Sequence, residues 1–454
     1  MLRYSIISKE WNKYLLVGVL LVWSFSWPLL NSIFDAVSAD YYDRFRMLML
    51  LVFTISALFC KMRVIRVGFG FVVILWLGFL SSLMAVRPIY ALVELILIIL
   101  AYLVFVQSQS FGIKQLYIFR FGLAETSLVF SILYGVLFYF SFFSFLASLP
   151  VGIFFRVDIV PLYPFVENVR YINSAQVILI FLPWLTVRLK QMWGMHVLFA
   201  LLASSLTLSL LLIGGARSGL LSVLLGLVVL FFTGKNKRAV LIYSLISIVL
   251  ALLLYFFTSL VSELVFNKGF TGDFFSRFGA GQLNSINAVT SSRYDLWVLA
   301  IKVAISNPLF GIGPQHFASL SSFVAHPHNF YLNIAAEWGI PALLLLVYLT
   351  YKYYRHLFQC LGGQVLLAVM VAILCDALWS GNTVYPISQM YILLVAMLVP
   401  PYQSVHGFVM SQSLTKAVAV TLAIGLVVLS VITFQSSLLE LGEAMPRFWI
   451  VGTF

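Results

Sequence analysis

The sequence predicts an all-α polytopic membrane protein with about 12–13 transmembrane helices and one large extramembrane loop that contains short amphipathic helices. Of its 454 residues, 62% are hydrophobic and only 9% are charged, whereas soluble domains are about 45–50% apolar and about a quarter charged. The apolar runs are continuous and do not alternate over about ten residues, as β-barrel strands do. The composition therefore excludes a water-soluble enzyme, a disulfide-rich secreted scaffold and a nucleic-acid-binding module.

The predicted spans follow from stretches of roughly 20 mostly apolar residues. They lie at 14–33, 47–60, 67–85, 89–107, 121–147, 174–188, 194–213, 218–232, 239–258, 331–350, 364–380, 387–401 and 416–434. Two polar intervals interrupt them, at 148–173 and 259–330. We therefore expect three parts: a bundle of about nine spans over 1–258, a loop with catalytic elements over 259–330, and further transmembrane helices over 331–454. Twelve spans instead of thirteen would put the C-terminus on the other side of the membrane.

The distribution of basic residues predicts the orientation. If the N-terminus is cytoplasmic and the spans alternate, sixteen of the 27 Lys and Arg residues fall in cytoplasmic segments, and Glu10 is the only acid among them. This asymmetry is typical of cytoplasmic loops, and it accounts for much of the net charge of +12. The bases left for the outer face are nearly all arginine, which grips phosphate better than lysine does: Arg44, Arg46, Arg87, Arg156, Arg170, Arg217, Lys268, Arg277, Arg293, Lys302 and Arg447. They indicate an anionic ligand, with chance in a small set as the alternative.

Arg217 lies in LLLIGGARSGLLSVLL, between two apolar runs on the predicted outer face. An ionisable residue at membrane depth indicates function. The alternative is a snorkelling side chain that reaches the lipid phosphates.

The loop 259–330 contains a predicted amphipathic helix. Ser292-Arg293-Tyr294-Asp295 resembles a capping box, LWVLAIKVAI continues with helical spacing, and Asn307-Pro308 ends it. Its apolar side contains Leu296, Leu299, Ala300 and Val303. Gly311-Ile312-Gly313-Pro314 lacks the third glycine of a nucleotide-binding loop and is interpreted as a turn.

His326-Pro327-His328-Asn329 precedes the span that begins near Tyr331. A histidine here suits a general base, because its ordinary pKa is close to neutrality. A structural role and a pair of metal ligands are the alternatives, although no HExxH motif or nearby third histidine completes a metal site.

Several acids invite two interpretations. Glu94, Glu125 and Asp376 lie within apolar runs, where pairing with neighbouring polar groups is the more common role and a proton relay the rarer one. Glu337 would either orient a substrate or cap its helix.

The stretch from Arg293 to Ala342 resembles the signature region of the O-antigen ligase and polymerase superfamily, bacterial inner-membrane glycosyltransferases of the GT-C type. Two shorter patterns resemble the ligase branch. One is Arg-x3-Leu, from Arg217 to Leu221. The other is His-[Asn/Ser/Gln]-x9-Gly-x-x-[Gly/Thr/Tyr], which starts at His328 and Asn329 and departs from the pattern only at Ala342.

The resemblance implies a glycan donor on undecaprenyl pyrophosphate, a lipid A–core acceptor, a periplasmic active site, membrane lipids as surroundings, and neither cofactor, metal nor nucleic acid. It implies catalytic roles for His328, Arg217 and Arg293. Substrate-binding roles are expected for Arg156, Arg170, His326, Asn329 and Tyr331. The first alternative is a polysaccharide polymerase of the same superfamily. An oligosaccharyltransferase fits less well, because such enzymes usually add a C-terminal soluble domain, which we do not expect after the last predicted span here. A transporter or flippase of lipid-linked sugar also fits less well, because no inverted repeat is evident.

Overall fold

The computed structural model describes residues 65–108, 113–149, 155–158, 169–190, 194–234, 236–271, 274–275, 293–320, 326–355, 357, 362–380, 386–399, 407–411, 413–422, 424–425 and 428. The predicted spans at 14–33 and 47–60, and the end of the predicted span at 416–434, lie outside these residues.

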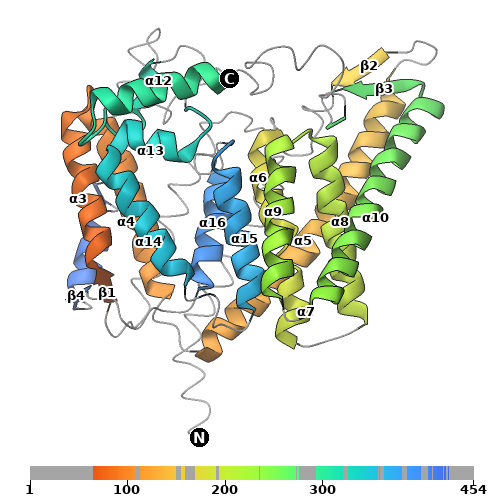
Figure 1. Ribbon diagram of the computed structural model, residues 1–454, viewed down its shortest axis with the longest axis horizontal. Coiled ribbons are helices and arrows are strands. Elements are labelled where there is room, and N and C mark those ends of the chain that lie inside the picture. Colours follow the sequence, from red (N-terminus) through yellow and green to blue (C-terminus); the bar gives the residue numbers. More distant parts are fainter. Residues whose placement is uncertain are drawn as a thin grey trace, which may run out of the picture.

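Within them the chain is an all-α bundle whose long helices run side by side in alternating directions (Figure 1). The helices are α3 (Phe69–Met84), α4 (Pro88–Ser108), α5 (Ile113–Ser148), α6 (Val169–Leu179), α7 (Trp184–Lys190), α8 (Met195–Ile213), α9 (Arg217–Thr233), α10 (Lys237–Leu264), α12 (Arg293–Ser306), α13 (Phe330–Trp338), α14 (Ile340–Tyr354), α15 (Gly363–Asp376) and α16 (Pro386–Met397), with a 3-10 turn η3 (His316–Leu320). Two short strand pairs accompany them: β1 (Ile65–Gly68) antiparallel to β4 (Gly407–Met410), and β2 (Phe155–Asp158) parallel to β3 (Lys268–Thr271).

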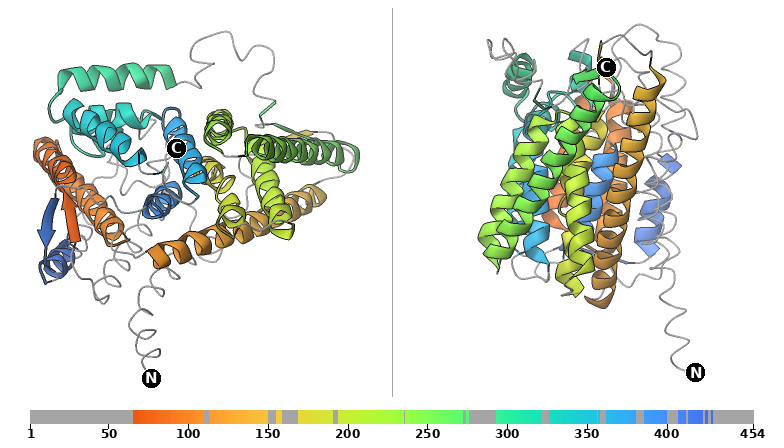
Figure 2. Two further views of the ribbon diagram at one scale, coloured as in Figure 1. Left: turned by 60° about the horizontal axis from the view of Figure 1, so that its bottom comes forward. Right: turned by 90° about the vertical axis from the view of Figure 1, so that its right-hand side faces the viewer.

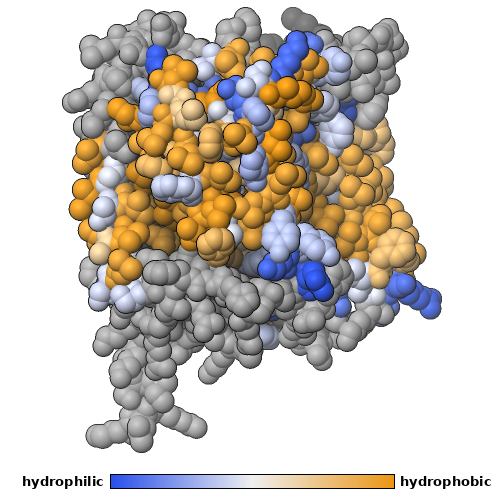
Figure 3. Space-filling model, turned by 60° about the vertical axis from the view of Figure 1, so that its left-hand side comes forward, coloured by the Kyte–Doolittle hydropathy of each residue, from blue (hydrophilic) through white to orange (hydrophobic). Residues whose placement is uncertain are grey.

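The bundle has the apolar exterior of a membrane protein. Three helical stretches, Leu116–Ser148, Met195–Ile213 and Lys237–Leu264, are long and apolar enough to cross a membrane, and eight shorter apolar helices accompany them among the described residues. Hydrophobic side chains form a broad band over the face shown in Figure 3. The predicted fold class is confirmed.

Helices α15 and α16 lie between two groups of helices (Figure 2). On one side, the largest cluster of buried apolar side chains joins α15 and α16 to α5, α6, α8 and α9, and it includes Phe181, Leu211, Leu366 and Leu394. On the other side, Trp338 packs with Ile74, Leu95 and Ala342 and joins α3, α4, α13 and α14. The C-terminal end of α15 therefore lies between these two groups of helices.

Two predicted spans are each divided in two. The stretch predicted at 174–188 breaks into α6 and α7 at a turn over residues 180–183, where Pro183 has no N–H for a helical hydrogen bond. The stretch predicted at 331–350 breaks into α13 and α14 at Gly339, whose φ of 89° is not helical. Neither break interrupts the hydrophobic run, so hydropathy alone could not reveal it.

The alternating helices bring the predicted outer and cytoplasmic bases to opposite ends of the bundle. One end, called here the α12 end, carries α12, α13 and the start of α9; the other, called the α7 end, carries the end of α7 and the start of α10 (Figure 1). Arg217 and Arg293 begin α9 and α12 at the α12 end, whereas Lys237 and Lys352 lie in α10 and α14 at the α7 end. The compartment that each end faces stays a prediction.

Candidate functional site

A buried carboxylate marks the centre of the α12 end. Asp376 is the last residue of α15 and is 2% exposed. Its Oδ2 accepts hydrogen bonds from the hydroxyls of Ser174 (2.8 Å) and Ser380 (2.7 Å), and the carboxylate also interacts with the side chains of Ser218 and Arg293. Asp376 therefore connects α6, α9 and α12 at one point.

Arg217 reaches this end through a tight reversal between α8 and α9. The chain turns at Gly214 and Gly215, where Gly215 has φ 64° and the N–H of Ala216 donates to the carbonyl of Leu211 at 3.3 Å. Arg217 then begins α9, half-buried, next to the Ser218 that contacts Asp376. The glycines predicted to allow a tight re-entry thus place the arginine where α9 meets the end of α15.

Arg293 begins α12, as the sequence predicted, and α12 ends at Ser306, before Asn307-Pro308. The helix lies across the end of the bundle (Figure 1). Its predicted apolar side packs against Phe317 of η3 and Ala336 of α13, rather than against the lipid-facing helices. This packing holds Arg293 in electrostatic contact with Asp376.

The His326–Asn329 turn is folded on itself. The N–H of His328 donates to Nδ1 of His326 at 3.1 Å, and the two rings meet edge-on with centroids 4.2 Å apart. His326 is 4% exposed and His328 is half-buried. His328 has φ 52°, a left-handed conformation that non-glycine residues rarely adopt. Since Nδ1 of His326 accepts a hydrogen bond, His326 orients the backbone of His328.

Four contacts attach this turn to its surroundings. The N–H of Phe330 donates to the carbonyl of Ala377 at 2.8 Å, and the hydroxyl of Tyr331 donates to the carbonyl of Leu374 at 3.3 Å. The indole N–H of Trp297 in α12 donates to the carbonyl of Pro327 at 3.0 Å. Asn329 caps α13, its side chain accepting from the N–H of Leu332 at 3.0 Å. The turn, α12 and the end of α15 therefore form one assembly.

The structure thus brings the elements that carry Arg217, Arg293, His326, His328 and Tyr331 to the end of α15. Arg170 lies in α6, one helical turn before Ser174, and so at the same end. Arg156 lies in β2, whose residues pair with β3 beside α8 and α10, on the far side of the bundle from α12 (Figure 1). Asn329 and Tyr331 were expected to bind substrate. In the structure the Asn329 side chain caps α13, and the Tyr331 hydroxyl donates to the carbonyl of Leu374.

Asp376 interacts with residues of more elements than its sequence context predicted. The expectation that it pairs with neighbouring polar groups is confirmed by Ser174 and Ser380. Its carboxylate also interacts with Arg293 and with Ser218, the residue after Arg217. The available signal was the serine four residues later, at Ser380, which is one helical turn from Asp376. Contacts with Ser174 and Arg293 are long-range and leave no trace in local sequence.

The other acids have structural partners. Glu94 accepts from Nε2 of Gln315 at 2.7 Å. The Glu337 carboxylate accepts from the N–H of Phe317 and from Nδ2 of Asn333, both at 3.1 Å, which fastens η3 to α13. Among the residues described, no three His, Cys, Asp or Glu side chains gather as they would around a metal ion.

A search of curated proteins found no match to the chain. A family model described as O-antigen ligase matches residues 200–347, an interval that contains Arg217, Arg293 and His328. The match covers about a third of the chain and supports its similarity to the O-antigen ligase superfamily. Members are membrane glycosyltransferases of the ligase or polymerase kind, and the membrane bundle agrees with that class. The resemblance to this superfamily predicted from the stretch Arg293 to Ala342 is confirmed. The matched interval also joins the start of α9, α12 and the histidine turn, the elements that meet at Asp376.

Proposed function

We propose that this O-antigen ligase superfamily member transfers a glycan from undecaprenyl pyrophosphate to a sugar hydroxyl of lipid A–core on the periplasmic face of the bacterial inner membrane. The observation that carries the proposal is that the three separate elements carrying Arg217, Arg293 and His328 meet at the end of α15. Two guanidinium groups and an imidazole at one end of a membrane bundle suit a reaction between a phosphate-bearing lipid and a hydroxyl.

In the proposed reaction the acceptor oxygen attacks the anomeric carbon as the bond from that carbon to the pyrophosphate oxygen breaks. The leaving polyprenyl pyrophosphate gains negative charge, and Arg217 and Arg293 stabilise that charge. His328 takes the proton of the attacking hydroxyl. A single displacement inverts the anomeric centre, and the arginines supply the charge stabilisation that a metal would supply elsewhere.

The remaining predicted residues have lesser parts in this proposal. Asp376 positions Arg293, and His326 positions His328. Arg170, in the first turn of α6, is proposed to hold a donor or acceptor phosphate. Substrate-binding parts are also proposed for Arg156, Asn329 and Tyr331, and the described contacts of Asn329 and Tyr331 support a structural part as well.

A polysaccharide polymerase is the second candidate, because the superfamily contains both activities. The description of the matching family and the short patterns at Arg217 and His328 favour the ligase. A transporter or flippase of lipid-linked sugar is the third, and the histidine turn held beside the arginines supports catalysis over transport.

The decisive experiment expresses His328→Ala and Arg217→Ala in a strain that lacks this protein and follows lipopolysaccharide on gels. Each variant is expected to fail to restore long glycan chains on lipid A–core, so that polymerised glycan accumulates on the polyprenyl carrier. His196→Ala and Arg355→Ala, at the α7 end, are matched controls that should restore normal chains. Lipid A–core bearing a single repeat unit would instead identify a polymerase, and normal chains in the His328 variant would refute the catalytic assignment.

A further inference from the structure

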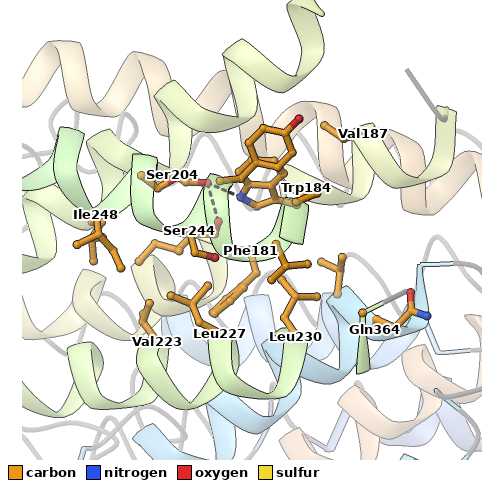
Figure 4. Close-up of a pocket in the computed structure, with 18 of the residues that line it drawn as sticks. Phe181, Trp184, Val187, Ser204, Val223, Leu227, Leu230, Ser244, Ile248 and Gln364 are labelled. Carbon is orange, nitrogen blue, oxygen red and sulfur yellow. Dashed lines mark hydrogen bonds between the residues drawn. The ribbon is translucent and has the colours of Figure 1, made fainter. Parts of the chain in front are cut away.

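A cavity of about 540 Å³ lies at the α7 end, away from the candidate site (Figure 4). Its walls come from α7, α8, α9, α10, the start of α15 and the turn between α6 and α7. Most wall residues are apolar, including Phe181, Val223, Leu227, Leu230 and Ile248. The volume falls within the range of about 300–1,000 Å³ that small-molecule sites have.

Small side chains on α10 create this space. Ser244 and Ser247 face the cavity from α10 (Figure 4 labels Ser244), where larger residues would fill it. Ser247 is 7% exposed, and among the residues described its hydroxyl is one of the few buried groups without a hydrogen-bond partner. Buried hydroxyls nearly always find a partner, so the wall at Ser247 faces unfilled space. The cavity is therefore a built apolar space within the membrane-spanning part.

Polar residues gather where the cavity reaches the α7 end. Asn236 and Gln364 line it there, where α9 ends and α10 and α15 begin. Trp184 stacks on Tyr243 with ring centroids 5.5 Å apart, and its indole N–H donates to Ser204 at 2.9 Å. An aromatic pair with polar tips is typical of the membrane interface. The cavity thus runs from the interface into the apolar interior.

Positive charge concentrates at the same mouth. Lys237 and Arg238 are the first two residues of α10, both are exposed, and the first turn of α10 contains no acid. The N-terminus of a helix already carries partial positive charge, so two cations there are unfavourable without an anion. The positive-inside rule explains the side of the membrane on which they lie; an anionic headgroup would also offset their repulsion.

We propose that the cavity binds one anionic phospholipid from the leaflet at the α7 end, with an acyl chain between α9 and α10 and the headgroup phosphate at Lys237 and Arg238. The occupant follows from the combination of an apolar interior, an interfacial aromatic pair and two exposed cations beside the mouth, of which Lys237 has its Nζ 5.9 Å from the centroid of the Phe231 ring. The site does not depend on the proposed glycosyl transfer, because it uses none of its residues.

Native mass spectrometry of the full-length protein tests this, after reconstitution with equal parts of phosphatidylglycerol and phosphatidylethanolamine. The wild type should retain one phosphatidylglycerol. Leu227→Trp, which fills the cavity, should lower the retained fraction about tenfold. Val228→Trp is the matched control, because the neighbouring Val228 is 48% exposed on the outer face of α9, and it should retain the lipid.

The double variant Lys237→Gln/Arg238→Gln tests the headgroup. Both side chains are exposed, and the change also removes the contact between Lys237 Nζ and the Phe231 ring. It should lower the preference for phosphatidylglycerol about tenfold, because each cation near an anionic surface contributes appreciably. Lys352→Gln, an exposed cation in the last turn of α14, is its control. Equal retention in Leu227→Trp and Val228→Trp, no preference between the two lipids, or displacement by added undecaprenyl phosphate would each overturn the proposal.

Discussion

The indole N–H of Trp297 donates a 3.0 Å hydrogen bond to the carbonyl of Pro327, and this contact joins α12 to the histidine turn. Trp297 also packs against Trp379, just beyond α15, with ring centroids 5.3 Å apart. The same side chain therefore touches both the turn that carries His328 and the segment that follows Asp376.

Trp297→Phe should keep the ring contact and lose the hydrogen bond. A net hydrogen bond contributes about 0.5–1.5 kcal/mol, so we expect glycan transfer to fall by about three- to tenfold as the turn loosens, with the protein still folded. The measurement is transfer rate in reconstituted vesicles at matched expression. Trp76→Phe, on the exposed outer face of α3, is the control. A Trp297→Phe variant as active as the control would show that the turn is held without this bond.

His328→Asn should separate folding from chemistry. Asparagine tolerates the left-handed conformation that His328 adopts with φ 52°, but its amide is not a base near neutral pH. We expect a variant with wild-type thermal stability and no detectable transfer. Substantial remaining transfer would exclude His328 as the base, and a large loss of stability would make its part structural.

Asp376→Asn should weaken transfer through Arg293. The amide can still accept from Ser174 and Ser380, whereas its attraction for the guanidinium is lost, so Arg293 is held less firmly. We expect transfer to fall by about tenfold, mainly through a lower kcat, because Arg293 acts on charge that develops as the pyrophosphate leaves. Asp295→Asn is the matched control, because Asp295 is exposed in the first turn of α12 beside Arg293. An unchanged kcat would contradict a positioning part for Asp376.

Gly339→Ala should destabilise the fold by about 2 kcal/mol or more. Gly339 has φ 89°, and a Cβ there would meet the carbonyl oxygen of Leu309. Gly194→Ala is an unusually close control, since Gly194 has φ 93° but a Cβ added to it would meet nothing within 4 Å. Detergent-solubilised protein should melt much lower for Gly339→Ala than for Gly194→Ala. Equal melting would show that backbone strain, and not the clash, dominates.

His316 should make the fold sensitive to acid. Burial lowers the pKa of this imidazole, whose Nε2 accepts from the N–H of Arg87 at 3.0 Å and whose Nδ1 lies 2.9 Å from the carbonyl of Pro314. Glu337 opposes that lowering and Arg87 adds to it. Because the folded pKa lies below the unfolded value, the unfolded state binds the proton first as the pH falls. The contribution of His316 to the free energy of unfolding is therefore fully present above about pH 6.5. Below that pH it declines by at most about 1.4 kcal/mol per pH unit.

The measurement is the thermal midpoint between pH 7.5 and 5.5, where His316→Gln should show a shallower decline than the wild type. His196→Gln, at the α7 end, is the control. Identical pH profiles for His316→Gln and the wild type would assign the acid sensitivity to other groups.

Hydropathy was enough to predict the fold class and most described spans, because membrane burial demands long apolar runs. The helical spacing of apolar residues between Arg293 and Pro308 also predicted α12. The breaks at 180–183 and Gly339 were missed because both lie inside apolar sequence. The meeting of Arg293, Asp376 and the residue after Arg217 joins segments far apart in the chain, and such contacts have no periodicity to detect. Arg217, Arg293 and His328 stay predicted site residues, and they were singled out because ionisable residues are rare near a membrane and because they match the family patterns.

The break at Gly339 makes the preceding loop part of the membrane bundle. The carbonyls of Ala336 and Glu337 accept 3.0 Å hydrogen bonds from Ile312 and Gly313, and the N–H of Ile340 donates to the carbonyl of Pro308 at 2.9 Å. Residues 308–313 thus supply the partners that an unbroken helix would supply to itself. In a chimaera between two such transferases, an exchange that stops at residue 330 would leave the ends of α13 and α14 facing a foreign loop. Crossover points in such chimaeras belong after α14, so that the loop and both half-helices travel together.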